Sequence, residues 1–225
     1  MDQRRNHAWT APLLDRPASR RQFLLGMGAA GLLLGLGTLR DRAFAQDLDL
    51  EMVLNDPASP LGGNPKGSLN IVTFFDYNCP FCRQASKPLG DVVRADGDIR
   101  LVYKEWPILT DASRDGAVLA LAAHRQGKYE TAHAALMAQE GRADPAAMRS
   151  VLEATDIDMT RLDADRAAHS KEINAHLDRN LAIAEALGLR GTPAYLVGPY
   201  LVASALDTAG FEQVIKDARA RGKDG

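Results

Sequence analysis

The chain holds only two cysteines, Cys79 and Cys82, and they flank the dipeptide Pro80-Phe81. They come directly after residues 71–75, an apolar β-type run, and they open a segment with a helical pattern. A thiol at a helix start lies near the positive end of the helix dipole and near unpaired N–H groups, and both favour the thiolate. The thiolate is the nucleophile in disulfide exchange, and a second thiol one helical turn further on can close a disulfide. The motif therefore predicts dithiol–disulfide chemistry at a strand-to-helix junction.

Two other uses of this cysteine spacing are weaker. A structural zinc site needs four ligands, and the sequence offers no further cysteine and no pair of histidines at zinc-finger spacing. The five histidines all lie away from the motif along the chain: His7, His124, His133, His169 and His176. A purely structural disulfide would close a very small loop, which constrains the unfolded chain little. We therefore expect no metal and no organic cofactor, because the dithiol is itself the redox group.

The N-terminus has the pattern of an export signal. Arg20 and Arg21 precede an apolar run at 23–39, and a small-x-small cleavage pattern ends at Ala45, before Gln46. The run has 17 residues, five of them glycine, which is short of the ~20 apolar residues that span a bilayer. The paired arginines resemble a twin-arginine signal, although a general secretory signal also has a basic start. We expect residues 1–45 to be cleaved and the protein to be periplasmic, where disulfides persist.

Composition then limits the partners. Residues 1–45 hold seven basic and three acidic residues, so the remaining 180 carry 20 basic and 26 acidic residues. A chain of 180 residues is long enough for one domain, or for one domain with a large insertion. Its formal charge is −6 and its basic residues do not cluster, so we expect no nucleic-acid partner.

Beyond residue 45 the pattern changes three times. Residues 46–68 are rich in Pro and Gly and predict an irregular arm, with at most a short strand near 52–54. Strand, helix and strand patterns follow at 69–75, 79–95 and 99–106. Helical patterns then fill most of the segment from 113 to 187. The chain closes with strand patterns at 194–197 and 200–203 around a Gly198-Pro199 turn, and with a helix at 211–221.

This order resembles the thioredoxin fold, and the inserted helices resemble the periplasmic disulfide oxidoreductases of the DsbA-like family. Three stretches carry the resemblance: 74–82 (FFDYNCPFC), 102–109 (VYKEWPIL) and 191–198 (GTPAYLVG). The resemblance implies an α/β thioredoxin fold with an all-helical insertion. Residues 69–107 and 189–225 would form the thioredoxin-like domain, and residues 108–188 the insertion.

The resemblance also assigns roles to residues. It implies a cis bond before Pro193, with the Thr192-Pro193 loop lying against the cysteine pair. Pro80, Phe81, Thr192 and Pro193 would then border a substrate groove, where an extended peptide can pair as an added strand. We expect Cys79 to be the exposed nucleophile and Cys82 to be the buried resolving thiol.

One position departs from the family pattern. Relatives often carry an acidic residue six positions before the first cysteine, where it accepts a proton from the buried cysteine, and this chain has Thr73 there. A threonine is no general base at neutral pH. Glu105, beside Lys104 on the neighbouring strand, is a candidate proton relay, and the alternative is an ion-paired or solvent-facing residue. Asp76 fits a cap or turn residue better than a base.

The sequence therefore predicts an exported enzyme, a protein disulfide oxidoreductase, that acts as a monomer on unfolded or partly folded exported proteins. Its redox partner would be a membrane protein of the DsbB-like or DsbD-like kind. Two alternatives stay open. The first is a disulfide isomerase or reductase of the same fold, which a threonine before the cis-proline favours by resemblance. The second is a non-catalytic periplasmic chaperone or thiol-based metal carrier.

Overall fold

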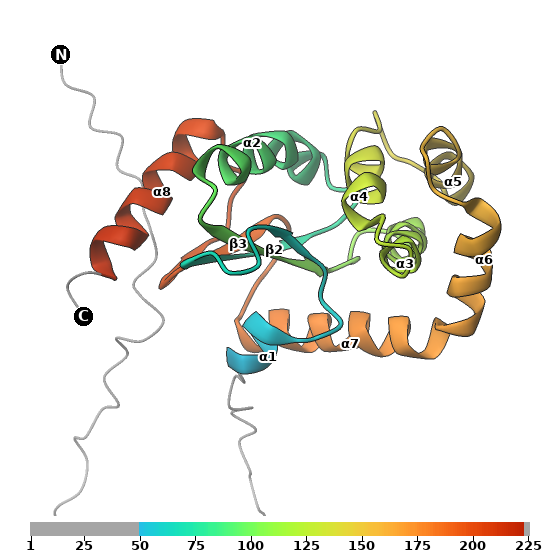
Figure 1. Cartoon of the computed structure of the whole chain (residues 1–225), viewed down its shortest axis with the longest axis horizontal. Coiled ribbons are helices and arrows are strands. Elements are labelled where there is room, and N and C mark those ends of the chain that lie inside the picture. Colours follow the sequence, from blue (N-terminus) through green and yellow to red (C-terminus); the bar gives the residue numbers. More distant parts are fainter. Residues whose placement is uncertain (1–49, 223–225) are drawn as a thin grey trace, which may run out of the picture.

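A five-stranded mixed sheet lies at the centre of the part of the chain that the computed structural model describes, residues 50–222 (Figure 1). The strands stand in the order β1-β3-β2-β4-β5. Their bounds are β1 (Leu61–Gly63), β2 (Leu69–Phe75), β3 (Ile99–Glu105), β4 (Ala194–Val197) and β5 (Tyr200–Val202). Strands β2 and β3 are parallel, and the other neighbouring pairs are antiparallel. The predicted export signal and its cleavage site lie outside the described residues.

Strand β2 is buried on both faces, as its continuous apolar run predicts. Side chains alternate along a strand, so Ile71 and Phe75 pack on one face, while Val72 and Phe74 pack on the other. Helices α2 (Pro80–Asp96) and α8 (Thr208–Arg221) contact each other and cover the first face. Helix α7 (Ser170–Ala186) covers the second face (Figure 1). The sheet therefore holds the C-terminal end of β2, and the motif that follows it, in a rigid core.

Five helices separate β3 from β4. They are α3 (Asp111–His124), α4 (Tyr129–Met137), α5 (Pro145–Glu153), α6 (Met159–Ala168) and α7. Helix α3 packs against the other four, and its small residues, such as Gly116 and Ala120, allow the close approach. Asp144 and Asp158 cap α5 and α6 by accepting hydrogen bonds from backbone N–H groups. The architecture is the thioredoxin fold with an all-helical insertion, as predicted. None of the helices within 50–222 has the length and apolar character of a bilayer-spanning segment.

The segment before β2 is more ordered than its Pro and Gly content suggests. The predicted strand near 52–54 is wrong, because Leu50–Asn55 forms helix α1, with Val53 buried against the sheet. A side-chain hydrogen bond from Asn55 to Glu51 joins positions four apart, which only a helix brings together. Strand β1 was not predicted either. It adds to β3 as an edge strand and ends at Gly63, whose φ of 64° suits glycine.

Candidate active site

Asp76 fixes the loop that joins β2 to α2. One carboxylate oxygen accepts a hydrogen bond from the N–H of Asn78 (2.7 Å). The other oxygen accepts from the N–H groups of Ile108 and Leu109, at 2.8 and 2.9 Å. The Asp76 carbonyl accepts from the N–H of Cys79 (3.0 Å). These bonds confirm Asp76 as a turn residue, and they hold the first cysteine in place relative to the segment after β3.

Cys79 is the N-cap residue of α2, and Pro80 occupies the first helical position. The pKa of the Cys79 thiol is lowered to about 5, mainly by the hydrogen bond from the Cys82 thiol, with further help from the Thr192 side chain and from the N–H groups of Phe81 and Cys82. Burial opposes this shift. The geometry therefore makes Cys79 a thiolate at neutral pH.

The expected exposure of Cys79 is wrong, because only 3% of the residue is accessible. As a thiol, Cys79 donates a hydrogen bond to the Thr192 carbonyl oxygen at 3.2 Å, so the loop before β4 covers the sulfur. Phe81, in contrast, is 60% exposed. Phe81, two residues after Cys79, therefore presents an exposed aromatic ring in the first turn of α2.

Cys82 lies in the first turn of α2 and is buried, as predicted. Burial raises its pKa far above the ordinary thiol range, and its hydrogen bond to Cys79 adds to the rise. The two sulfurs therefore differ strongly in acidity. One is set up as a nucleophile, while the other keeps its proton until a reaction requires its removal.

The Thr192-Pro193 peptide bond is cis, as the resemblance implied. Phe81, Thr192 and Pro193 all border a cleft of about 410 Å³. The cleft is also lined by residues 188–191, 201 and 203–205. Pro80 is exposed in the first turn of α2 but is not among the lining residues. Three of the four predicted groove residues thus come together beside the nucleophile.

Lys104 and Glu105 are both buried. The Lys104 ammonium donates to the Met52 carbonyl (3.0 Å) and to the Ser59 hydroxyl (2.8 Å), and burial lowers its pKa to about 8. Glu105 accepts a hydrogen bond from the Tyr129 hydroxyl, and its second oxygen lies 3.6 Å from the His176 ring. The solvent-facing alternative for Glu105 is wrong. Neither side chain hydrogen-bonds to a sulfur among the described contacts.

Sequence reasoning missed His133, on α4. It lines a small cavity together with Cys82 and Thr73, although it lies far from the motif along the chain. Burial lowers its pKa to about 4, so the ring is neutral at pH 7. Nothing in the helical pattern around residue 133 marks it, because an Ala- and Leu-rich helix shows which face is buried but not which element that face meets.

Comparison with known proteins gives consistent results. A family model described as a DSBA-like thioredoxin domain matches residues 70–216. A solved thioredoxin-like oxidoreductase from Silicibacter pomeroyi DSS-3 is 39% identical, with a TM-score of 0.71, and the match covers 76% of this chain and 97% of that one. A periplasmic thioredoxin-like protein from Salmonella enterica serovar Typhimurium is 26% identical, with a TM-score of 0.67, over 77% of this chain and 97% of that one.

The curated proteins that match are much longer. The Na(+)/H(+) antiporter NhaA 1 of Mycobacterium sp. (strain KMS) is 28% identical over 153 aligned positions, and the match covers 64% of this chain and 25% of the antiporter. The chain thus spans about a quarter of the length of the curated relatives it matches.

Proposed function

The chain belongs to the family of DSBA-like thioredoxin domains, and from this membership and the site geometry we propose that it is an oxidoreductase that donates the Cys79–Cys82 disulfide to protein thiols. The observation that carries this proposal is the acidity difference between the two sulfurs at the start of α2. A stabilised Cys79 thiolate favours the reduced form of the pair, and a protein with a stable reduced form is a strong oxidant.

The reaction needs only the groups at the site. A substrate thiolate attacks the Cys79 sulfur, the Cys79–Cys82 bond breaks, and Cys82 leaves with the electron pair and takes a proton. A second substrate thiolate then attacks the substrate sulfur of the mixed disulfide. Cys79 leaves as a thiolate, which its pKa of about 5 makes a good leaving group. The substrate gains a disulfide, and the enzyme is left with two thiols.

Phe81, Thr192 and Pro193 would hold the substrate during this exchange. They border the cleft beside Cys79, and extended peptides bind such edges by main-chain pairing. We assign unfolded or partly folded exported proteins as substrates, and a membrane redox protein as the partner that restores the disulfide. Reductase or isomerase activity uses the same groups in the opposite direction. A lower potential of the couple would favour that direction.

We expect the oxidised protein to transfer one disulfide per molecule to reduced, unfolded ribonuclease A. Loss of substrate thiols would be followed with Ellman's reagent after acid quenching, together with the appearance of two thiols on the enzyme. Enzyme that has been reduced and then alkylated at both cysteines is the control. If the substrate keeps its thiols when mixed with fully oxidised enzyme, the proposed activity is wrong.

We further propose that the protein works in the periplasm. The support is the sequence of residues 1–45, together with the likeness to the periplasmic Salmonella protein. Changing Arg20 and Arg21 together to lysine should leave the uncleaved precursor in the cytoplasm of a bacterium that has the twin-arginine route. Cell fractionation followed by immunoblotting would show whether the precursor stays in the cytoplasm. Unchanged periplasmic levels would point to the general secretory route instead.

A further inference from the structure

Beside Cys82 lies a small, partly open cavity of about 20 Å³ between α2, α4, β2 and β4. Its polar lining consists of Thr73, Ser86 and His133, and the rest of the wall is mainly apolar. A space of this size holds about one water molecule, which needs two to four polar partners. The cavity therefore has the volume and the polar groups for one water between the Cys82 thiol and the groups opposite it.

Cys82 needs a proton acceptor at this place. When it attacks a mixed disulfide on Cys79 it must lose its proton, yet burial raises its pKa far above neutral. Thr73 lines the same cavity but is no base. Among the hydrogen bonds of residues 50–222, the Glu105 carboxylate accepts one from Tyr129 and makes none to either sulfur.

His133 lines the same cavity as Cys82 and comes from helix α4. Its Nδ1 lies 3.2 Å from the Tyr77 hydroxyl, and its Nε2 lies 3.5 Å from the Ser86 hydroxyl. The Tyr77 hydroxyl interacts with that of Tyr129, which donates in turn to Glu105. If each group donates towards the carboxylate, the Nδ1 proton points to Tyr77 and Nε2 is left as an acceptor on the Ser86 side.

We propose that His133 is the proton acceptor for Cys82: Nε2 takes the thiol proton through one water in the cavity while Cys82 attacks Cys79. This inference rests on the proposed function. In the step, the Cys79–Cys82 bond forms, the bond between Cys79 and the substrate sulfur breaks, and the substrate leaves as a thiolate with the electron pair. The two tyrosine hydroxyls connect the resulting imidazolium to the Glu105 carboxylate. Glu105 is thus a remote stabilising group rather than the direct base.

The surroundings of His133 set its pH behaviour. It faces Tyr77 from the loop before α2, Tyr103 from β3, Tyr129 on its own helix and Cys82 from α2. The Glu105 charge acts on it from the end of β3 and partly offsets the effect of burial, which lowers the pKa to about 4. Above that value the ring is neutral and can accept a proton, so resolution by Cys82 should not depend on pH between 5 and 8.

Stopped-flow mixing of the reduced protein with excess Ellman's reagent separates the reactions of the two cysteines in time. Cys79 attacks first, in a phase whose rate rises with reagent concentration. Cys82 then releases the second nitrothiobenzoate in a phase independent of that concentration. For His133→Phe, which keeps an aromatic ring in place, we expect the second phase to slow about 100-fold at pH 7, the lower end of general-base effects. The rate of this second phase should also rise tenfold per pH unit in the variant, because hydroxide must then remove the Cys82 proton.

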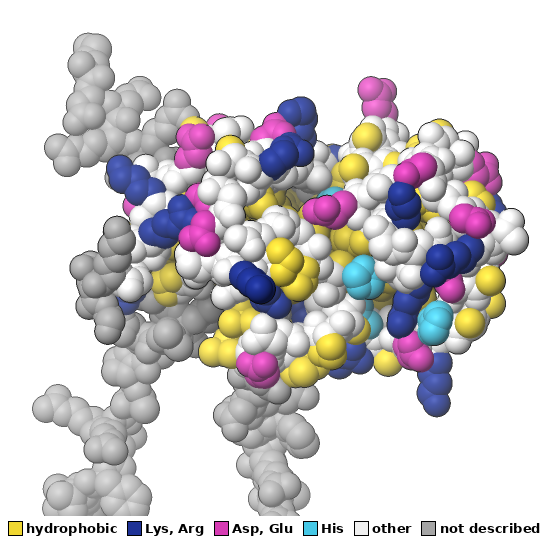
Figure 2. Space-filling model, in the orientation of Figure 1, with side chains coloured by type: hydrophobic (Ala, Val, Ile, Leu, Met, Phe, Trp, Pro, Cys, Tyr) yellow, Lys and Arg dark blue, Asp and Glu magenta, His cyan; other side chains and the backbone are white. Residues whose placement is uncertain are grey.

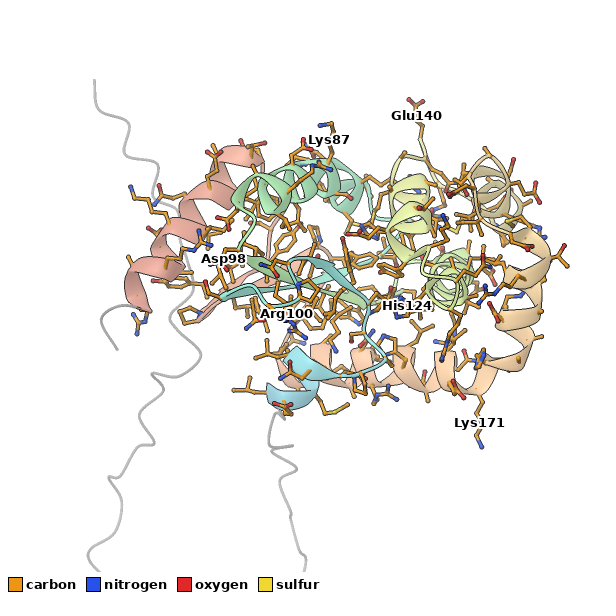
Figure 3. The ribbon with its side chains drawn as sticks, in the orientation of Figure 1. Lys87, Asp98, Arg100, His124, Glu140 and Lys171 are labelled. Atoms are coloured by element: carbon orange, nitrogen blue, oxygen red, sulfur yellow. The ribbon has the colours of Figure 1, made fainter. Side chains whose placement is uncertain are left out.

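His124→Phe is the matched control. His124 lies on α3 at a separate cleft towards α7 and also contacts the Tyr129 ring, but it does not line the cavity (Figure 3). This variant should keep the wild-type second phase. An unchanged second phase in His133→Phe would overturn the proposal. If that variant does not fold, the pH dependence of the wild-type second phase tests the proposal instead. A wild-type rate that rises tenfold per pH unit from 5 to 8 also overturns the proposal. Failure of the proposed function gives a different result, with no second release from the wild type at any pH.

Discussion

Replacing Cys79 by serine is expected to reduce disulfide exchange to the uncatalysed background rate. Its sulfur is the one that the structure makes a thiolate, with a pKa lowered to about 5 by Cys82, Thr192 and the start of α2. A serine hydroxyl cannot form the mixed disulfide, and the remaining thiol, Cys82, is buried and keeps its proton. Turnover on reduced ribonuclease A in a glutathione buffer measures the loss.

Cys82→Ser is the matched variant and should behave differently. It keeps the nucleophile but lacks the resolving thiol, so mixed disulfides should accumulate between Cys79 and proteins whose disulfides it attacks. These appear as higher-mass bands on non-reducing gels and disappear with dithiothreitol. If Cys79→Ser keeps full activity, or if Cys82→Ser traps no substrate, the roles of the two cysteines are wrongly assigned.

The free energy of unfolding of the reduced protein should rise relative to that of the oxidised protein as pH rises. The expected slope is about 1.4 kcal/mol per pH unit between pH 5 and 8.5. The pKa of Cys79 is lowered in the folded reduced state, so the unfolded chain binds one more proton in this window and its stability rises with pH. The gain is lost as pH falls through about 5. Above about 8.5 the unfolded Cys82 also ionises, and its raised pKa in the folded state reverses the trend.

Urea unfolding of both forms at pH 5, 6, 7 and 8 measures this difference. The oxidised form has no thiol to titrate and supplies the baseline, so other ionisable groups largely cancel. Cys79→Ser should remove the pH dependence of the difference between dithiothreitol-treated and oxidant-treated samples. A difference that stays constant across this range would mean that Cys79 has an ordinary thiol pKa.

Local sequence patterns predict the strands and helices around the cysteines because each has a strong signal. The apolar run before Cys79 suits a central strand, and the Gly198-Pro199 turn separates β4 from β5. The arm was harder to predict. Helix α1 has only six residues, and the buried contact of Val53 under the sheet holds it in place rather than helix propensity. Strand β1 forms because β3 offers it an edge, and a short Gly-rich segment gives no sign of that.

The candidate site likewise contains some features that the sequence predicts and others that depend on tertiary packing. The cysteines and Asp76 are local features, so their places at the start of α2 follow from the sequence. The cover over Cys79 comes from Thr192, which only the folded sheet brings against the sulfur. His133 and Cys82 line one cavity because α4 packs against α2, and that packing depends on how the inserted helices dock.

On the face shown in Figure 2, acidic and basic side chains are interspersed, and no extended basic patch covers that face. The exposed Phe81, beside the cleft at the cysteines, gives an unfolded chain an apolar contact. These features suit a protein substrate with an accessible thiol.

Equilibration of the Cys79–Cys82 couple with glutathione buffers tests the central claim most directly. Acid-quenched samples would be alkylated, and the fractions of dithiol and disulfide determined by mass spectrometry. We predict a single two-electron transition with a potential between about −180 and −120 mV, the range of disulfide-donating proteins. A potential near about −270 mV would contradict the proposed donation of disulfides. If no Cys79–Cys82 disulfide forms in any buffer, the claim that this pair is a redox site is wrong.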